Sequence, residues 1–371
     1  MKELSEQEIE DLLHGAKVLG AGGGGEIEWA RPMIEEVYKA GKIFTLIDPN
    51  DLPDDEYVAI VGLVGGGVSE AIKKKVAGLP RIQNPEIVAT TELGNYLNKE
   101  LYAFIASEIG SGNSIVPLYV GAMTDRPAVD ADCCGRAKPE IVNSTTNVKG
   151  IPVTPLAIVS PFGDRMILRK AVNDSRAEDI CRYMAIVSGG MCGVARCAVK
   201  GKDIQTAIVP NSITNAIRVG RVVRQAFEKE QSPVDALIQA TGGFKFFEGK
   251  VTSFTRKDEG AFIWGEIEFK GRDDYIGDTL RVWYKNEFLI SYKNDHPYVT
   301  CPDTICIVDA KTAKGLSNWG DDFQRGRPVI VFGVQAYELW RTERGLELFS
   351  PKYFGYDIEY KPIEKLVKED L

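Results

Sequence analysis

Three carboxylates lie just beyond two apolar segments whose residue types are typical of buried strands. Glu108 follows "LYAFIAS", and Asp130 and Asp132 end the segment "PAVDAD". In an open parallel sheet, ligands bind beyond the carboxyl ends of the strands, and strand residues two positions apart share a face. If the two strands are neighbours, the three carboxylates face one crevice. Such a cluster favours proton transfer or the binding of a divalent metal ion by these three side chains.

The residues after Asp132, "CCGRAKPEI", could extend this cluster. Arg136 and Lys138 carry positive charge that could offset the carboxylates. Glu140 adds a fourth carboxylate, for which the alternative role is the electrostatics of a helix start. Helix caps and surface ion pairs remain the alternative explanation for the whole cluster, since such carboxylates also occur in structural roles.

The chain has seven cysteines but only two histidines, and the small number of histidines limits which cysteine or serine could be activated as a nucleophile. Cys133 and Cys134 have no histidine near them in sequence, and adjacent cysteines bridge each other only with strain. We therefore expect them to shape the wall that faces a substrate rather than to attack it. The histidine count excludes a multi-histidine zinc site. The irregular cysteine spacing favours free thiols in a reducing compartment.

A run of glycines in "LGAGGGGEIEWA" has the spacing of a dinucleotide-binding fingerprint at Gly20, Gly22 and Gly25. That fingerprint requires a buried strand before its first glycine. The preceding residues instead predict a capped amphipathic helix, with Ser5 and Glu8 as a capping box. We expect a turn between two helices. Its backbone amides could still hold a carboxylate or carbonyl oxygen of a substrate, and these amides belong to Gly22, Gly23, Gly24 and Gly25.

The order of the predicted elements indicates an α/β fold with two domains. Apolar strands alternate with helices in the first part, which predicts a mostly parallel sheet covered by helices. After Gly242 the chain is rich in short alternating strands, which predicts a β-rich domain of barrel or sandwich type. We place the domains at residues 1–165 and 166–371, with the candidate site in the first and two helices near the start of the second, at 175–187 and 213–229.

The overall charge and the N-terminus restrict the partners. The chain of 371 residues has a formal net charge of -8, which argues against nucleic acid and against an anionic membrane surface. The N-terminus "MKELSEQEIEDLL" lacks the order of a secretory signal, and the sequence contains no apolar run of membrane-spanning length. We expect a cytoplasmic protein that forms a homo-oligomer.

Several stretches resemble the S-methyl thiohydantoin desulfurase family, a hydantoinase-associated family formerly catalogued as a domain of unknown function. They are "GAKVLGAGGGG", "ASEIGSGNSIVPLYVGAM" and "PAVDADCCGRAKPEI", with "NEFLISY", "CPDTICIVD" and "SPKYFGYDIEY" similar in kind to its C-terminal domain. The resemblance covers nearly the whole chain. The chain departs from the family at Cys133 and Cys134, where glycine and methionine are common, and at Lys138, where an aromatic residue is common. The family motif falls on Gly22 to Gly25, Glu108, Asn113, Asp130, Asp132, Gly135, Arg136, Pro139 and Glu140.

The resemblance implies hydrolytic cleavage of a carbon–sulfur bond on a thiohydantoin ring, which releases a thiol and leaves a hydantoin. Glu108 or Asp132 could act as general base, and a protonated neighbour could give its proton to a ring nitrogen. Arg136, the loop amides or a divalent metal ion could hold the developing negative charge. Asn113 could pair with the alternating N–H and C=O groups of the ring.

The sequence thus predicts a hydrolase whose substrate is a small cyclic thio-amide or a hydantoin-like ring. The predicted catalytic residues are Glu108, Asp130, Asp132 and Arg136. The predicted substrate-binding residues are the four glycines of the turn, Asn113, Cys133 and Glu140. No cofactor is certain, and a divalent metal ion is the one candidate. Two alternatives stay open: a nucleotide-dependent enzyme that uses Gly20 to Gly25, and a non-catalytic subunit that binds ring compounds and partners a hydantoinase.

Overall fold

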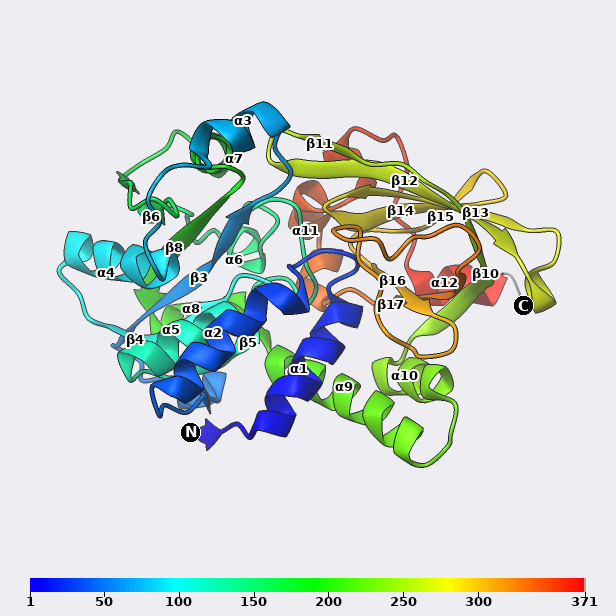
Figure 1. Cartoon of the computed structure of the whole chain (residues 1–371), viewed down its shortest axis with the longest axis horizontal. Helices are drawn as coiled ribbons and strands as arrows, with labels where there is room; N and C mark the ends of the chain where they lie inside the picture. Colours follow the sequence, from blue (N-terminus) through cyan, green and yellow to red (C-terminus); the bar gives the residue numbers. More distant parts are fainter. Residues whose placement is uncertain (370–371) are drawn as a thin grey trace.

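The computed structural model describes residues 1–369, in which two β-sheets stand side by side and most helices pack on the first (Figure 1). The α-helices are α1 Glu6–Leu19, α2 Ile27–Lys39, α3 Glu70–Val76, α4 Pro85–Leu97, α5 Ile115–Thr124, α6 Thr145–Val148, α7 Asp174–Val187, α8 Gly201–Ile204, α9 Ser212–Glu228, α10 Pro233–Thr241, α11 Glu343–Leu348 and α12 Ile363–Glu369. Short 3-10 helices are η1 Pro49–Asp51, η2 Gln205–Ala207, η3 Asp273–Tyr275, η4 Glu338–Arg341 and η5 Pro351–Phe354. Among residues 1–369, no helix is both long and apolar enough to cross a membrane.

The first sheet is mixed, with a parallel centre and antiparallel edges. Its strands are β1 Lys2–Glu3, β2 Thr45–Ile47, β3 Tyr57–Gly65, β4 Leu101–Ala106, β5 Ala128–Asp132, β6 Leu156–Val159, β7 Arg165–Leu168, β8 Met191–Lys200 and β9 Val209–Pro210. The order is β1-β2-β5-β4-β3-β8-β6-β7, and β9 pairs with β5. The strands β2, β5, β4 and β3 are parallel, so their carboxyl ends lie at one edge. The predicted neighbours β4 and β5 do pair.

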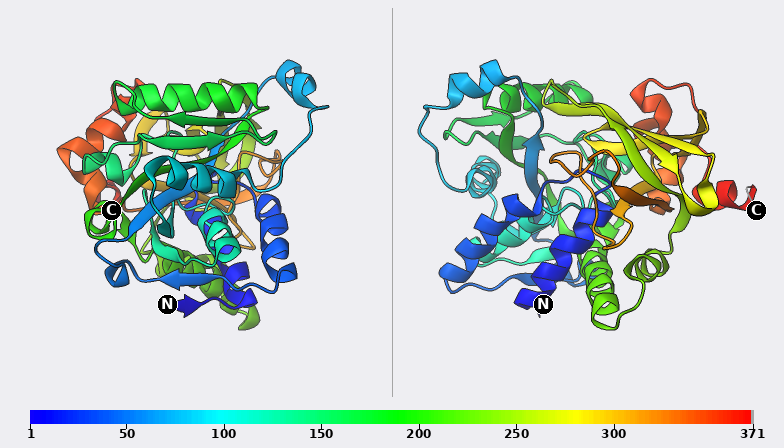
Figure 2. Two further views of the ribbon diagram at one scale, coloured as in Figure 1. Left: turned by 90° about the vertical axis from the view of Figure 1, so that its left-hand side faces the viewer. Right: turned by 45° about the vertical axis from the view of Figure 1, so that its right-hand side comes forward.

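The second sheet is antiparallel and curls toward a barrel. Its strands are β10 Phe244–Phe254, β11 Lys257–Glu259, β12 Phe262–Gly271, β13 Thr279–Lys285, β14 Glu287–Lys293, β15 His296–Thr300, β16 Thr304–Asp309 and β17 Pro328–Val334. The order is β15-β14-β13-β12-β10-β17-β16, with β11 on β12. Figure 2 shows this sheet (yellow to orange) beside the first from two further directions. The predicted α/β fold with a β-rich second part is confirmed.

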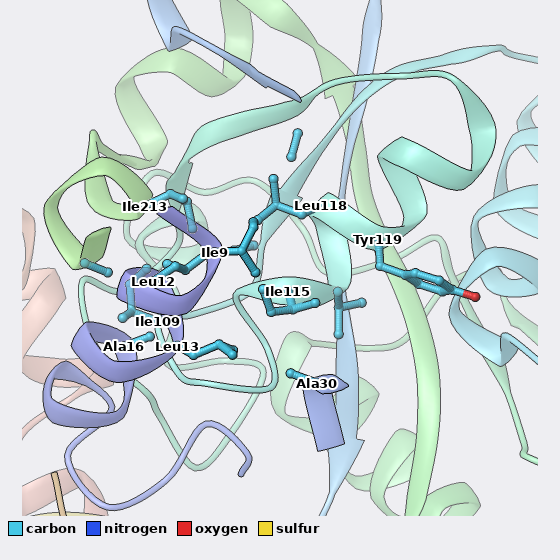
Figure 3. Packing of buried hydrophobic residues seen from close by; sticks show 14 of the residues in the cluster. Ile9, Leu12, Leu13, Ala16, Ala30, Ile109, Ile115, Leu118, Tyr119 and Ile213 are labelled. Atoms are coloured by element: carbon cyan, nitrogen blue, oxygen red, sulfur yellow. The ribbon is translucent and has the colours of Figure 1, made fainter. Parts of the chain in front are cut away.

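The first sheet continues beyond the predicted boundary at residue 165. Residue 165 begins β7, and the long strand β8 pairs antiparallel with β3 near the middle of the sheet. The helix α9 likewise contributes Ile213 to the core on α1 (Figure 3). The physical reason is that the middle of β8, residues 192–197, is buried and the strand pairs with β3 on one side and β6 on the other, so β8 is an interior strand of this sheet.

The pair of helices α1 and α9 approaches closely because each carries a glycine at the crossing. A Cβ atom added to Gly15 would lie 1.9 Å from the carbonyl oxygen of Ala216, and one added to Gly220 would lie 1.9 Å from that of Asp11. Around this contact, Ile9, Leu12 and Leu13 of α1 pack in one core with α5 (Figure 3). The end of α1, and therefore the glycine turn that follows, is fixed against the body of the protein.

Asp130 holds the first turn of α9. Its Oδ1 accepts a hydrogen bond from Thr214 N at 2.9 Å, and its Oδ2 accepts one from Thr214 Oγ1 at 2.5 Å. We expect Asp130→Ala to lower the free energy of unfolding by about 2 kcal/mol, because it leaves a partly buried N–H group without its charged acceptor. Chemical denaturation measures the change. Asp235→Ala, at an exposed aspartate in the first turn of α10, is the matched control, with at most about 0.5 kcal/mol expected. An equal effect of both substitutions would contradict the capping role.

Candidate active site

A small cavity lies where the carboxyl ends of β3 and β4 meet the glycine turn after α1 and the turn between β13 and β14. Its volume is about 60 Å³. A single water molecule needs roughly 10–15 Å³ of cavity volume, so this cavity has room for a small ring rather than for a dinucleotide. The lining residues are Gly24, Gly25, Trp29, Leu63, Val64, Gly65, Ser107, Glu108, Gly112, Asn113, Lys138, Pro139, Glu140, Ile141, Arg182, Met191, Val194, Asn286, Glu287 and Trp319.

Glu108 enters this cavity as a buried carboxyl group that two donors hold in place. Its Oε1 accepts a hydrogen bond from Asn113 Nδ2 at 2.7 Å, and its Oε2 accepts one from the backbone N–H of Lys138 at 3.1 Å. Asn113 is itself fixed, because its Oδ1 accepts a hydrogen bond from Leu63 N at 3.1 Å. Asn113 therefore orients Glu108 through its amide nitrogen, while its amide oxygen already accepts one hydrogen bond from the backbone.

Glu287 is the second carboxyl group of the cavity, and it comes from the other sheet. It begins β14, is 2% exposed, and its Oε2 has no hydrogen-bond partner within residues 1–369. The chain makes room for it at Gly23, where an added Cβ atom would lie 2.0 Å from Glu287 Oε1. A side chain at position 23 would therefore displace this carboxyl group.

Burial raises the pKa of both carboxyl groups, and it raises that of Glu287 further. For Glu108, desolvation is opposed by the charge of Lys138 and by the hydrogen bonds from Asn113 and from the Lys138 backbone. For Glu287, desolvation is reinforced by the negative charge of Glu108, while the buried cations of Arg136, Arg182 and Lys138 oppose it less. A pair of carboxyl groups in unequal surroundings shares protons unequally. The surroundings therefore favour the ionised form of Glu108 and the protonated form of Glu287.

The glycine turn supplies backbone to the cavity wall. Gly24 O accepts hydrogen bonds from Gly112 N and Asn113 N, both at 3.0 Å, which ties the turn to the loop that carries Glu108. Gly24 and Gly25 line the cavity with positive φ angles of 75° and 86°. Within residues 1–369, their N–H groups donate to no protein acceptor. Gly22 and Gly23 instead pack beneath Phe288 and Glu287. The turn connects α1 to α2 as predicted, so no strand precedes its first glycine.

The predicted cluster of three carboxylates does not form, because two of its members have other partners. Asp130 hydrogen-bonds Thr214 through both oxygens. Asp132 is fully buried, and its Oδ2 accepts hydrogen bonds from Cys134 N at 2.8 Å and Gly135 N at 2.7 Å. Burial raises the pKa of Asp132 to about 7. Neither aspartate lines the cavity, although the predicted pairing of their strand with β4 is correct.

The predicted metal ligands Glu108, Asp130 and Asp132 therefore do not fit a divalent ion as a set. Within residues 1–369, no group of three or more histidine, cysteine, aspartate or glutamate side chains has the arrangement of a metal site. Both oxygens of Asp130 and one oxygen of Asp132 already accept hydrogen bonds from the protein, and neither aspartate lines the cavity with Glu108.

Arg136 lies outside the cavity wall and joins the two parts of the protein. Its guanidinium group donates to three carbonyl oxygens, those of Ala137 at 3.0 Å, Asp303 at 2.8 Å and Phe288 at 2.7 Å. It also faces the ring of Phe349, at 5.6 Å from the centroid. The predicted contact with a developing oxyanion is not available to a group that is 1% exposed and so bonded. Its positive charge still acts on Glu287 through space.

The remaining predicted residues divide between core and wall. Cys133 and Cys134 are buried in apolar clusters, do not line the cavity, and burial raises the pKa of the Cys133 thiol to about 12. The structure therefore places neither cysteine on the wall of this cavity, where the prediction would have put them. Glu140 does line the cavity, but no helix begins there, and its carboxylate binds Lys285 and accepts a 2.6 Å hydrogen bond from Tyr353.

Several residues that line the cavity were not predicted from the sequence: Glu287, Ser107, Arg182 and the two tryptophans Trp29 and Trp319. Glu287 had one signal, an acidic residue that opens the otherwise apolar "NEFLISY". Arg182 is held by Glu178 and by the carbonyl of Pro139, at 2.6 Å and 2.9 Å. Trp29 and Trp319 form an edge-to-face pair with ring centroids 4.8 Å apart, and Trp319 Nε1 has no acceptor in the described part of the chain.

Two family models match the chain end to end. The N-terminal domain of the S-Me-THD-like type matches residues 7–170, and the C-terminal domain of the same type matches residues 172–363. The chain belongs to the S-Me-THD-like family. Glu108 lies in the first match and Glu287 in the second, so the cavity of this family member is completed by both domains.

The fold is shared with a solved structure, a protein from Chromobacterium violaceum determined by X-ray crystallography. The two chains are 22% identical, the match covers 98% of this chain and 100% of the other, and the TM-score is 0.79. This likeness concerns the fold alone. No curated protein matches the chain.

The raised pKa of Glu287 predicts a pH dependence of stability. An acid whose pKa is higher in the folded state binds more protons folded than unfolded above its unfolded pKa of about 4.3, so the free energy of unfolding falls as pH rises. Glu287→Gln removes this effect. We expect the variant to gain stability relative to the parent between pH 5 and pH 8, measured by urea denaturation. Glu268→Gln, at an exposed strand residue of the same sheet, is the control and should show no such gain. A constant difference across this range would contradict the buried proton.

Proposed function

We propose that this protein is a hydrolase of the desulfurase type that cleaves the carbon–sulfur bond of an S-substituted thiohydantoin or a related hydantoin-like ring. The observation that carries the proposal is the pair Glu108 and Glu287, two buried carboxyl groups with unequal surroundings in a cavity of ring size. Water would add to the ring carbon that bears sulfur, and the thiol would then depart.

Glu108 is the proposed general base. The donors on its two oxygens, Asn113 Nδ2 and Lys138 N, favour its ionised form and fix its orientation. A base must lie within hydrogen-bond reach of the proton that it takes, and a fixed carboxylate in a small cavity meets this requirement for a single bound water. Its raised pKa makes it a stronger base than an exposed glutamate.

Glu287 is the proposed general acid. Because it keeps its proton while Glu108 is ionised, it can give that proton to the ring nitrogen as water adds to the neighbouring carbon. The unbonded N–H groups of Gly24 and Gly25 can hold a ring carbonyl oxygen on which negative charge develops. These two amides take the role that sequence analysis had also offered to Arg136.

The two alternatives are less well supported. The nucleotide-dependent enzyme requires a strand before Gly20, where the chain has α1, and a larger site than this cavity. A non-catalytic ring-binding subunit would need no acid–base pair, so this alternative does not explain why the surroundings of Glu108 and Glu287 differ. Thiol release by the purified protein separates it from the hydrolase.

Thiol release from an S-methyl thiohydantoin, followed with a thiol reagent, tests the proposal. Glu108→Gln should lower kcat by about 100- to 10,000-fold, the usual loss for a general base. Glu287→Gln should lower kcat and remove the alkaline limb of the pH–rate profile, since that limb reports loss of the acid's proton. Asp132→Asn is the matched control: its carboxyl group is buried but lies outside the cavity, and kcat should stay within about tenfold of the parent.

Three results would contradict the proposal. The parent protein could release no thiol, Glu108→Gln could retain full turnover, or Asp132→Asn could lose as much turnover as Glu108→Gln. The last result would return the role of base to Asp132. Thermal unfolding of each variant establishes that the loss of turnover is not a loss of fold.

A further inference from the structure

Ser107 places a hydroxyl group at the cavity wall between two buried cations. It follows β4 directly and lines the cavity beside Glu108. Its Oγ accepts a hydrogen bond from Lys138 Nζ at 3.1 Å and another from Arg196 Nη2 at 3.3 Å. Lys138 is 5% exposed and Arg196 is fully buried. Within residues 1–369 neither cation makes a salt bridge, although buried cations are normally paired with an acid, and the charge of Lys138 acts on Glu108 through space.

The two cations leave the proton of Ser107 without a partner in the protein. A serine hydroxyl has one donor and two acceptor sites. Both acceptor sites of Ser107 are occupied, and across the described residues its O–H donates to no protein atom. Hydrogen bonds received from cations polarise the hydroxyl and strengthen its own donation. The wall therefore presents a polarised O–H group in positive surroundings, which suits an anion that forms in the cavity.

We propose that the Ser107 hydroxyl donates its proton to the departing sulfur, and that Lys138 and Arg196 act through it as positioning residues. This inference rests on the proposed function. In that reaction Glu108 receives a proton from water, Glu287 donates a proton to the ring nitrogen, and the amides of the glycine turn bind a ring carbonyl oxygen. These groups leave the negative charge that develops on the departing sulfur without a donor. The Ser107 hydroxyl lines the cavity and is in contact with the two cations Lys138 and Arg196.

The step balances as follows. The carbon–sulfur bond breaks and its electron pair stays on sulfur, which takes the proton of Ser107 Oγ to give a thiol. Ser107 recovers a proton from Lys138 Nζ. The ring carbon forms its carbonyl as the added hydroxyl loses its proton to Glu287, which had given one to nitrogen. Glu108 releases to solvent the proton that it took from water, and Lys138 takes one up, so the site is restored.

The dependence of turnover on the leaving group tests this role. An S-ethyl thiohydantoin and its S-(2,2,2-trifluoroethyl) analogue differ little in size, but the fluorines stabilise the thiolate. Assistance to the departing sulfur matters less for the second compound. Ser107→Ala should lower kcat by about 100-fold for the S-ethyl compound, the usual loss of one preorganised donor, and by less than about 10-fold for the fluorinated one.

Ser144→Ala is the matched control. Ser144 Oγ accepts a hydrogen bond from the same Arg196 Nη2 at 3.0 Å, but Ser144 lies outside the cavity. Its substitution should change kcat for the two compounds by the same factor. Lys138→Met keeps the side-chain stem and removes the ammonium. It should reproduce the leaving-group dependence of Ser107→Ala, and it carries the test if Ser107→Ala does not fold.

The outcomes separate this inference from the proposed function. Equal losses for the two compounds in Ser107→Ala and Lys138→Met would overturn the role of Ser107 and leave the hydrolase intact. The role of Ser107 is supported if Ser107→Ala lowers kcat for the S-ethyl compound at least tenfold more than for the fluorinated compound, and Ser144→Ala shows no such difference. A parent protein that releases no thiol from either compound overturns the proposed function, and this inference with it.

Discussion

The buried guanidinium group of Arg136 is the contact on which the arrangement of the cavity depends. It donates to carbonyl oxygens of the second domain at Phe288 and Asp303, and to Ala137 on its own loop. Carbonyl acceptors leave the charge of Arg136 unneutralised, so the group is costly to bury and can be kept only where every N–H is well placed. Since Phe288 follows Glu287 directly, the same bonds that join the domains fix the second carboxyl group of the site. Arg136, predicted from the sequence as a catalytic residue, instead joins the two domains and so positions Glu287 in the cavity.

The proposed reaction requires that two carboxyl groups in one cavity differ in protonation, one ionised and the other neutral. Both carboxyl groups are removed from water, which alone would raise both pKa values. The difference has local causes: the charge of Lys138 and the hydrogen bonds from Asn113 and the backbone favour the ionised form of Glu108, whereas an oxygen of Glu287 accepts no hydrogen bond within residues 1–369. Because the first acid ionises, the second is held neutral by its field. In the proposed reaction, these surroundings make Glu108 the base and Glu287 the acid, which leaves Ser107 as the donor to sulfur.

Local patterns in the sequence predicted the elements well and predicted their contacts only in part. The capping box of Ser5 and Glu8 and the helix-to-helix glycine turn follow from neighbours in the chain, and both are present. The position of Glu108 beyond β4 followed from the strand-end rule, which also paired β4 with β5. That rule could not show that α9 would take Asp130 as a cap, because Thr214 is distant in sequence. Glu287 reaches the cavity only through packing between domains, and no local pattern encodes that packing.

The cavity keeps polar atoms unpaired that a folded protein would ordinarily satisfy. Among residues 1–369, Glu287 Oε2 and Trp319 Nε1 are buried and have no hydrogen-bond partner in the protein, and both residues line the cavity. A buried polar group left unbonded costs about 1–3 kcal/mol, so a bound ligand that meets these atoms recovers part of that cost. A hydantoin-like ring alternates N–H and C=O groups and so offers both a donor and an acceptor. Glu287 Oε2 and Trp319 Nε1 are therefore the atoms that can select a ring with this pattern over an apolar ring of the same size.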